Sequence, residues 1–312
     1  MATDTAAPAA RVKQKEEAPK SSWAKSRERL AWALVAPSLL VVVGVALYPL
    51  FEAFRLSLTN ARIGSTRPTE YVGFDNYRYI FNDQKFIDSL WHTVQFTVFS
   101  VSIETVLGMG VALIIHSNFK GRSLLRTSML VPWAVPTVVS TRIWQWMLND
   151  KYGVINDLAV NRLHILDEKV AFIANSNTIL PSIIAVDVWK TTPFMALLLL
   201  AGLQVIPSDV YEASRVDGAS KIQQFFQITL PLLRPALLVA LIFRTLDAFR
   251  VFDVVYVMVG YSADAMTVSV YARQTLIDLS RLGRGSAASV VIFLCIAVMV
   301  VGYTRLVKVE EN

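Results

Sequence analysis

The sequence predicts an all-α membrane protein with six transmembrane helices. Of its 312 residues, 54% are hydrophobic and only 17% are charged, so the chain is too apolar for an ordinary soluble domain of this length. A helix that crosses a bilayer needs about 20 mostly apolar residues. The uncharged run Leu30–Phe51 has this length and Ser286–Tyr303 comes close to it, so both are predicted to span the membrane.

Residues 1–29 are rich in Ala, Pro, Lys and Glu and show no apolar periodicity, so we expect a disordered tail. Its seven basic residues place it in the cytoplasm by the positive-inside rule. The apolar run that follows is longer than the core of a signal peptide and has no small-residue cleavage site. It is therefore expected to persist as a membrane anchor.

Four weaker spans are predicted between the two uncharged runs, because each candidate combines an apolar pattern with one or more charged residues. The six spans are expected at about residues 30–54, 90–116, 124–148, 178–203, 232–260 and 286–304. Together they form one transmembrane domain over residues 30–306. An even number of spans returns the C-terminal tail, residues 307–312, to the cytoplasmic side.

The chain lacks the sequence motifs of several catalytic and metal-binding sites. No G-x-x-x-x-G-K-[ST] phosphate loop occurs, so the chain is not expected to hydrolyse ATP, and G-x-S-x-G and H-E-x-x-H are also missing. The histidines, His92, His116 and His164, are not at metal-ligand spacing, so no metal or cofactor is expected. The single cysteine, Cys295, excludes a disulfide within the chain. The net charge of +6 fits membrane orientation, and no basic patch interleaved with aromatic residues indicates nucleic-acid binding.

A polar segment, "EASRVDGASKIQQFFQITLP", lies between the fourth and fifth predicted spans. The spacing of a capping box, in which two side chains satisfy free amides at a helix start, occurs at Asp209 with Glu212 and at Ser220 with Gln223. Gly218 can adopt the left-handed conformation that closes a helix. The segment is therefore predicted to form a helix, a glycine elbow and a second helix, which Pro231 ends before the fifth span begins.

Apolar residues recur at three- and four-residue steps in the second of these helices. The resulting stripe is expected to lie on the protein's own spans or on the membrane interface. It consists of Ile222, Phe225, Phe226 and Thr229. By these features alone, the segment is either an amphipathic interfacial linker or a docking element for a soluble partner.

The same segment resembles the E-A-A…D-G-A…F…I-x-L-P loop of the permease subunits of bacterial ABC importers. The matching positions are Glu212, Ala213, Ser214, Asp217, Gly218, Ala219, Phe225, Ile228, Leu230 and Pro231. Ser214 departs from the pattern, since alanine is usual there. The resemblance implies the ABC type I importer permease fold and a loop, residues 207–231, that docks on an ATP-hydrolysing subunit. Glu212 and Asp217 would then carry the contact and Gly218 the turn, flanked by Ala213, Ser214 and Ala219.

The likeness covers most of the chain after the tail and is closest to carbohydrate importers of the maltose and glycerol-phosphate type. It rests on the segments "YVGFDNYRYIF", "RSLLRTSMLVPWAVPTVVSTRIWQWML" and "FRVFDVVYVMVG". The last segment ends in Gly260 and runs on as "GYSADAMT", residues 260–267, where the family usually has a glycine-glycine-proline turn, so the loop after the fifth span is expected to differ in shape. The tail and overall pattern resemble the trehalose-importer permeases of mycobacteria, which implies a disaccharide such as trehalose. Maltose-like sugars and glycerol-3-phosphate remain alternatives.

Membership of this family also implies partners. They are a second permease subunit, usually a different chain, two ATPase subunits or domains that use ATP and Mg, and a solute-binding protein outside the membrane. The chain itself would be a non-catalytic half of the pore in the plasma membrane, surrounded by lipid and without a bound cofactor. The alternatives are a secondary transporter driven by an ion gradient, for which the loop would have no purpose, and a membrane scaffold or enzyme.

Charged residues inside a span are costly and usually face the bundle interior or water. In the fifth span, Arg244, Asp247, Arg250 and Asp253 alternate in sign at three-residue steps, so neighbours can pair. This pattern indicates either a neutralised ladder that packs against other helices or a polar lining for a hydroxylated solute. The candidates for the solute pathway are Arg244, Asp247, Phe243 and Arg250, with Phe249 and Phe252 as further flat apolar faces.

The sequence allows two further pairings in the spans: Asp187 with Lys190, which lie one helical turn apart, and Glu104 with Arg142, which are isolated in their own spans, across helices. The tryptophans in the third span are expected at interfaces or in packing, rather than as platforms for a sugar. They are Trp133, Trp144 and Trp146.

Overall fold

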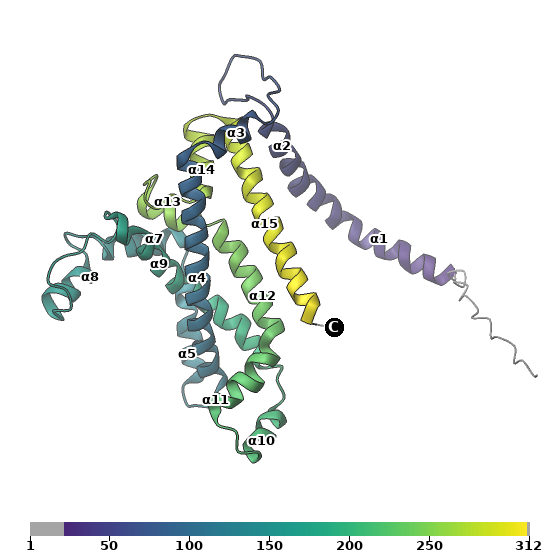
Figure 1. The fold of residues 1–312 in the computed structure, drawn as a ribbon. Coiled ribbons are helices and arrows are strands. Elements are labelled where there is room, and N and C mark those ends of the chain that lie inside the picture. Colours follow the sequence, from purple (N-terminus) through teal and green to yellow (C-terminus); the bar gives the residue numbers. More distant parts are fainter. Residues whose placement is uncertain (1–21, 311–312) are drawn as a thin grey trace, which may run out of the picture. The chain divides into compact units, whose positions relative to one another are not determined.

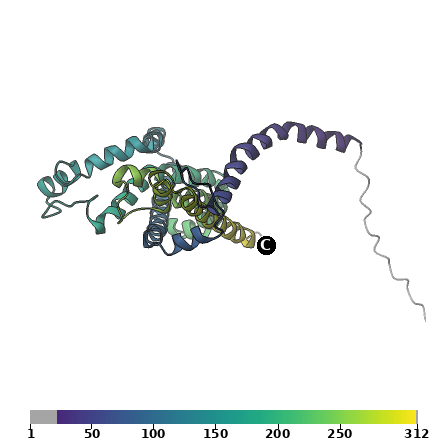
Figure 2. The ribbon, with the colours of Figure 1, turned by 90° about the horizontal axis from the view of Figure 1, so that it is seen from above.

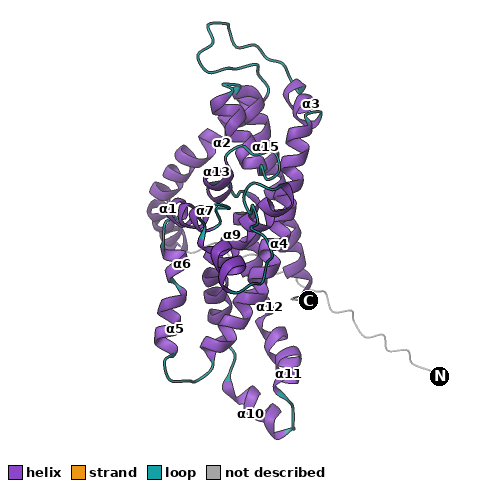
Figure 3. Ribbon diagram, turned by 90° about the vertical axis from the view of Figure 1, so that its left-hand side faces the viewer, coloured by secondary structure: helices purple, strands orange, loops and turns teal. Residues whose placement is uncertain are grey.

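The computed structural model describes residues 22–310, which are mostly helical (Figures 1 and 3). Among them, the one β-type pairing is an isolated antiparallel bridge between Thr59 and Tyr71. Most of the predicted disordered tail lies outside the described residues. For residues 22–29 that prediction is wrong, because α1 begins at Ser22. Helix formation is cooperative, so an apolar helix extends into flanking residues of good helix propensity.

The chain divides into two compact units, Met1–Glu52 and Ala53–Asn312. In the first unit, α1 (Ser22–Val42) leads through a π-helical turn (Val43–Leu47) into α2 (Tyr48–Ser57), which ends in the second unit. The second unit contains the remaining helices and the sites discussed below.

The helices of the second unit follow in the order α3 (Asp75–Phe81), α4 (Gln84–His116), α5 (Arg122–Met129), α6 (Val131–Ala134), α7 (Thr137–Met147), α8 (Val154–Asn156), α9 (Ser176–Leu203), α10 (Ser208–Val216), α11 (Lys221–Gln224), α12 (Leu230–Phe249), α13 (Asp253–Val259), α14 (Val268–Arg273) and α15 (Leu282–Glu310). Short π-helical turns follow α8, α11 and α14. Because α15 extends to Glu310, the predicted C-terminal tail, residues 307–312, begins inside this helix. Seen from above, α4, α12 and α15 lie close together, and the segment with α7 and α8 reaches out to one side (Figures 1 and 2).

Five helical stretches of the described residues are long and apolar enough to cross a membrane. They are Ser26–Ser57, Gln84–His116, Ser176–Leu203, Lys221–Val259 and Leu282–Arg305. The other predicted span, 124–148, is not a continuous helix but the three short helices α5, α6 and α7. The main break falls at Val135, whose extended backbone (φ −73°, ψ 133°) follows from the steric restriction that Pro136 places on the residue before it.

The fifth span also differs from its prediction at both ends. Pro231 does not end the preceding helix, because the chain stays helical from α11 through a π-helical turn into α12, where Pro231 occupies the first turn. Since the chain is already helical at this point, Pro231 removes one backbone hydrogen bond, and it lies just after the π-helical turn. At the other end, α12 stops at Phe249 and α13 begins at Asp253. The predicted ladder is therefore split, with Asp253 on a separate helix.

The packed part of the second unit is organised around α4 and α9. Their backbones approach closely at Gly108, where an added Cβ would lie 2.7 Å from Met195 Cγ and 3.2 Å from the backbone nitrogen of Ala196. Small residues permit such contacts between membrane helices. Two apolar cores form along these helices. One includes Phe86, Phe96, Val101, Ile183, Val188 and Ala248, and the other includes Met109, Ile115, Met195, Leu199, Leu233 and Ala240.

Candidate functional site

A buried cluster of charges lies where the two apolar cores meet. Arg244 of α12 donates from Nε and Nη2 to the carboxylate of Glu104 on α4, and from Nη2 to Asp187 on α9. The side chains of Arg244 and Glu104 are 2% and 0% exposed, and that of Asp187 is 10% exposed. One guanidinium therefore joins three helices of the packed region, α4, α9 and α12.

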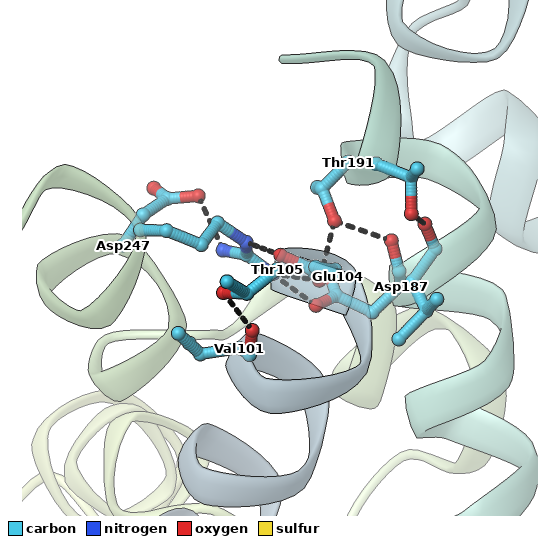
Figure 4. Close-up of polar contacts among 9 residues, drawn as sticks. Val101, Glu104, Thr105, Asp187, Thr191 and Asp247 are labelled. Carbon is cyan, nitrogen blue, oxygen red and sulfur yellow. Dashed lines mark hydrogen bonds and ion pairs between the residues drawn. The ribbon is translucent and has the colours of Figure 1, made fainter. Parts of the chain in front are cut away.

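Further polar groups complete this cluster. Arg244 Nη1 donates to Asp247 Oδ2 at 3.0 Å, which confirms the predicted pairing of these two residues. The Thr191 hydroxyl lies 2.6 Å from Glu104 Oε1 and 2.6 Å from the carbonyl oxygen of Asp187 (Figure 4). A buried charge is tolerated only when it is paired and hydrogen-bonded, and both conditions are met here.

The position of the cluster follows from the order of residues along each helix. Apolar core residues precede and follow the charged residue on α4, on α9 and on α12: Val101 and Met109 flank Glu104, Val186 and Met195 flank Asp187, and Ala240 and Ala248 flank Arg244. When these helices pack side by side, the three charged residues lie at the same height along the bundle. The cluster is thus a polar layer between two apolar layers.

A cavity of about 570 Å³ opens beside this layer. It lies within the range of about 300–1,000 Å³ that is usual for small-molecule sites. Its polar lining consists of Thr137, Asp187, Lys190, Thr191, Arg244, Asp247, Arg250 and Asp253, and its aromatic lining of Trp133 and Phe252. A smaller adjoining cavity of about 280 Å³ shares Trp133, Thr191, Arg244, Asp247 and Arg250 and adds Phe194 and Phe243.

The four candidates for the solute pathway differ in their exposure and in their hydrogen bonds. The side chains of Asp247 and Arg250 are 61% and 67% exposed, lie 3.7 Å apart and both line the two cavities. Phe243 is 57% exposed and borders the smaller cavity. Arg244 is different, because four of its five N–H donors bond to the carboxylates of Glu104, Asp187 and Asp247. Its side chain holds the wall of the cavity instead of presenting free donors to it.

The two further pairings that the sequence allows are not formed. Glu104 pairs with Arg244, whereas Arg142 bonds to Gln145 Oε1 at 2.7 Å on its own helix. Asp187 also pairs with Arg244, and Lys190 instead donates to the carbonyl oxygens of Val135 and Pro132. The sequence shows which residues are charged but not which helix faces which, and Arg244 is 140 positions from Glu104.

Trp133 is the tryptophan of the third span that reaches the cavities, and its ring stacks on Phe194 of α9 with centroids 6.3 Å apart. Trp144 packs edge-on against Trp189, and Trp146 lies against Tyr152. Lys190, Thr191 and Trp133 are the cavity residues missing from the predicted pathway. Helical spacing offered a signal for Thr191, because it lies four positions after Asp187 on one helix face.

The second candidate site is the polar elbow of α10, Gly218 and α11. Gly218 has the predicted left-handed conformation (φ +80°), and the capping box of Ser220 and Gln223 is present in both directions. The other predicted box, of Asp209 with Glu212, is wrong. Pro207 is the N-cap of α10 and makes no side-chain capping bond, and Ser208 donates to Asp209 instead.

One contact ties α10 to the foot of α12, since the hydroxyl groups of Tyr211 and Thr229 lie 3.0 Å apart. Ser214 is buried and donates to the carbonyl of Tyr211. Of the other residues expected at the contact, Glu212, Ala213, Asp217 and Gly218 are exposed and Ala219 is half-buried. The elbow therefore has one face on the protein and one face free.

The apolar stripe of the elbow is covered on only one side. Thr229 is buried and Phe225 packs against the second core, as predicted. Ile222 and Phe226, however, are 72% and 61% exposed, and Val216 on α10 is 87% exposed. Apolar side chains and carboxylates thus share the free face, which is the composition expected of a surface that a partner covers.

The loop after the fifth span forms a cluster of its own. Tyr261 donates to Asp278, which also accepts from Arg273 Nη1 at 3.2 Å, and the Arg273 guanidinium lies 4.5 Å from the centroid of the Tyr256 ring. Burial, together with the bond to Asp278, raises the pKa of Tyr261. These contacts fasten the "GYSADAMT" segment to the end of α14 and to the π-helical turn that follows it.

Comparison with known proteins places the chain among transporters. Residues 104–309 match the family described as the binding-protein-dependent transport system inner membrane component. The chain belongs to this family. It is a non-catalytic, multi-pass component of the inner membrane, the permease of an ABC importer. Among residues 22–310, no group of His, Cys, Asp and Glu side chains could hold a metal ion.

The permease has close relatives along almost its whole length. It is 41% identical to the trehalose/maltose transport system permease protein MalF of Thermococcus litoralis, over 92% of this chain and 97% of that protein. It is 38% identical to the trehalose transport system permease protein SugA of Mycobacterium tuberculosis, over 90% and 89%. It is 36% identical to the sulfoquinovosyl glycerol transport system permease protein SmoG of Agrobacterium fabrum, over 96% and 98%.

A solved structure shares the fold of the permease. A chain of a bacterial ABC transporter that imports the acidic polysaccharide alginate superposes with a TM-score of 0.80 at 22% identity, covering 93% of this chain and 99% of that one. At this identity the similarity establishes the fold alone. The predicted fold class is therefore confirmed.

Proposed function

We propose that this permease forms half of the pathway through which an ATP-driven importer moves a neutral disaccharide, with trehalose as the leading candidate. The observation that carries the proposal is the cavity beside the charge cluster, which has a polar lining, aromatic borders at Trp133 and Phe252, and a volume in the small-molecule range. Two of the relatives, MalF and SugA, carry trehalose in their names, which supports this choice of sugar.

The charges around the cavity favour a neutral solute. Three acidic and three basic side chains line it: Asp187, Asp247 and Asp253, with Lys190, Arg244 and Arg250. Each base also has a partner in the protein, either a carboxylate or a backbone carbonyl. Recognition of a phosphate or sulfonate uses free Arg or Lys donors. Glycerol-3-phosphate is therefore a weaker candidate than trehalose or a maltose-like sugar.

The coupling to ATP is assigned to the loop 207–231. Glu212, Ala213, Ser214, Asp217, Gly218 and Ala219 would form the contact with an ATPase subunit, which binds the ATP and Mg. The free face of the elbow, with two carboxylates and exposed Val216, supports this role. The elbow belongs to the cytoplasmic side in this arrangement, and both termini share that side.

The complete importer would contain a second permease chain, two ATPase subunits or domains and a solute-binding protein outside the membrane. ATP-dependent closure of the ATPase subunits would move the elbow and rock the two permease halves between inward- and outward-facing states. A transporter driven by an ion gradient is the alternative. It would take up the sugar without any ATPase.

The test is affinity purification of the permease in mild detergent from its own host, with ATPase assays against a panel of trehalose, maltose and glycerol-3-phosphate. We expect an ATPase to co-purify and trehalose with its binding protein to stimulate hydrolysis. Glu212→Lys should reduce the amount of ATPase recovered, because it reverses a charge on the free face of the elbow.

A matched control is Asp264→Lys, which reverses an exposed carboxylate in the loop after α13. It should leave the recovered ATPase unchanged. Purification of folded wild-type permease without any ATPase would overturn the importer proposal and favour the ion-driven transporter.

A further inference from the structure

The broken third span is held by a lysine from a different helix. Pro136 has no amide hydrogen, so the carbonyl of Pro132, four residues earlier, loses the donor that a continuous helix would supply. Lys190 of α9 approaches this break. Its Nζ lies 2.6 Å from the carbonyl oxygen of Val135 and 3.4 Å from that of Pro132. The ammonium thus provides donors where the backbone has none.

The surroundings of Lys190 favour these hydrogen bonds to the backbone. The residue is 8% exposed, and the described contacts of its Nζ are with these two carbonyls. The carboxylate one turn earlier, Asp187, is taken by Arg244. A buried cation with backbone carbonyls as its partners is uncommon, since a lysine is rarely buried without a strong pairing. Its hydrogen bonds at the end of α6, together with the attraction of the nearby Asp187 carboxylate, stabilise the ammonium there.

A second contact from the same face of α9 reaches α6. Phe194 lies four residues after Lys190, which places the two side chains one above the other on a helix. The Phe194 ring stacks on Trp133, with an angle of 14° between the planes. α6 is a single turn, so Lys190 holds its backbone and Phe194 holds its one aromatic side chain.

We infer that Lys190 is a positioning residue for the solute cavity: its ammonium bonds the backbone carbonyls of Val135 and Pro132 at the break before Pro136 and keeps α6, with Trp133, in the cavity wall. The inference rests on the proposed function, in which the solute passes through this cavity. Trp133 lines both cavities, and Val135 and Pro136 line the larger one. Displacement of α6 would therefore reshape the wall and leave the elbow at α10 and α11 untouched.

The first measurement is the proximity of α6 to α9 in the assembled importer. In a Cys295→Ser background, Trp133→Cys and Phe194→Cys supply the only two thiols of the chain, and a short bifunctional thiol reagent joins them. We expect Lys190→Met to slow this cross-linking about tenfold, because loss of the bonds to these two half-buried carbonyls releases the turn. Lys151→Met, which alters an exposed lysine, should leave the rate unchanged.

The second measurement uses the permease with its tryptophan and phenylalanine intact. Lys190→Met should raise the trehalose concentration that gives half-maximal uptake about tenfold, while the ATPase recovered with the permease and the maximal rate change little. A proportional loss of maximal rate, with half-saturation unchanged, would reduce Lys190 to a structural residue and overturn the inference. Equal cross-linking rates in Lys190→Met and Lys151→Met would overturn it as well.

A third variant tests the inference if Lys190→Met impairs folding. If Lys190→Met lowers the yield of folded permease, addition of Pro136→Ala should restore part of it, because the new amide hydrogen can bond to the Pro132 carbonyl. No restoration would contradict the inference. If the wild type takes up none of the sugars, the proposed function fails, while cross-linking still decides whether Lys190 holds α6.

Discussion

The charge cluster and the polar elbow place the same kinds of residues in opposite surroundings. Around Arg244, two carboxylates and a guanidinium are almost completely buried and pair with one another. In the elbow, Glu212 and Asp217 are exposed, and apolar Val216 and Ile222 are exposed beside them. The first arrangement satisfies its charges within the chain, whereas the second leaves its surface for another molecule.

This difference separates structural from interaction roles among charged residues of a membrane protein. Removal of one partner from a buried ion pair strongly destabilises the folded protein, because the remaining charge has no water to solvate it. An exposed carboxylate contributes little to the stability of its own chain. The same substitution, loss of a charge, should therefore affect folding in the cluster and association in the elbow.

The largest effect is expected from Arg244→Met. It leaves Glu104 and Asp187 buried without a cation, so the variant should lose about 3–5 kcal/mol of stability. Thermal unfolding of the purified permease in detergent, followed by size-exclusion chromatography, measures this loss. The control is Arg250→Met, whose side chain is 67% exposed and which should change stability by less than about 1 kcal/mol. Equal stability of the two variants would refute a structural role for the cluster.

An intermediate effect is expected from Gly218→Val. A β-branched residue in the left-handed region costs about 1–2 kcal/mol, so the elbow should distort while the permease still inserts in the membrane. Recovery of the ATPase with the permease should fall. Gly64→Val is the matched control, because Gly64 also has positive φ (+71°) and no neighbour within 4 Å of an added Cβ. If both variants recover equal amounts of ATPase, the elbow is not the contact.

The smallest effect on stability is expected from Asp247→Asn. Its side chain is 61% exposed and amide oxygen can still accept from Arg244, so stability should change by less than about 1 kcal/mol. If Asp247 accepts a hydrogen bond from the solute, the concentration for half-maximal uptake should rise about fivefold. An unchanged uptake rate and solute profile would remove Asp247 from the pathway.

The sequence by itself determined the features that depend on neighbouring residues. The apolar runs, the helix–glycine–helix elbow and the Ser220 capping box could be predicted, because hydropathy and turn chemistry act over a few positions. The pairing of Arg244 with Asp247 was of the same kind, since i,i+3 neighbours meet on any helix. The resemblance of the loop to ABC permeases likewise needed only a short segment.

The tertiary structure alone decided which helices face one another. Glu104 and Arg142 were both unpaired within their spans, yet only packing of α4 against α12 shows that Glu104 meets Arg244. The break in the third span follows from Pro136, but its stabilisation by Lys190 depends on how α9 lies against α6. Such contacts join positions that are tens of residues apart, and side-chain periodicity carries no information about the partner helix.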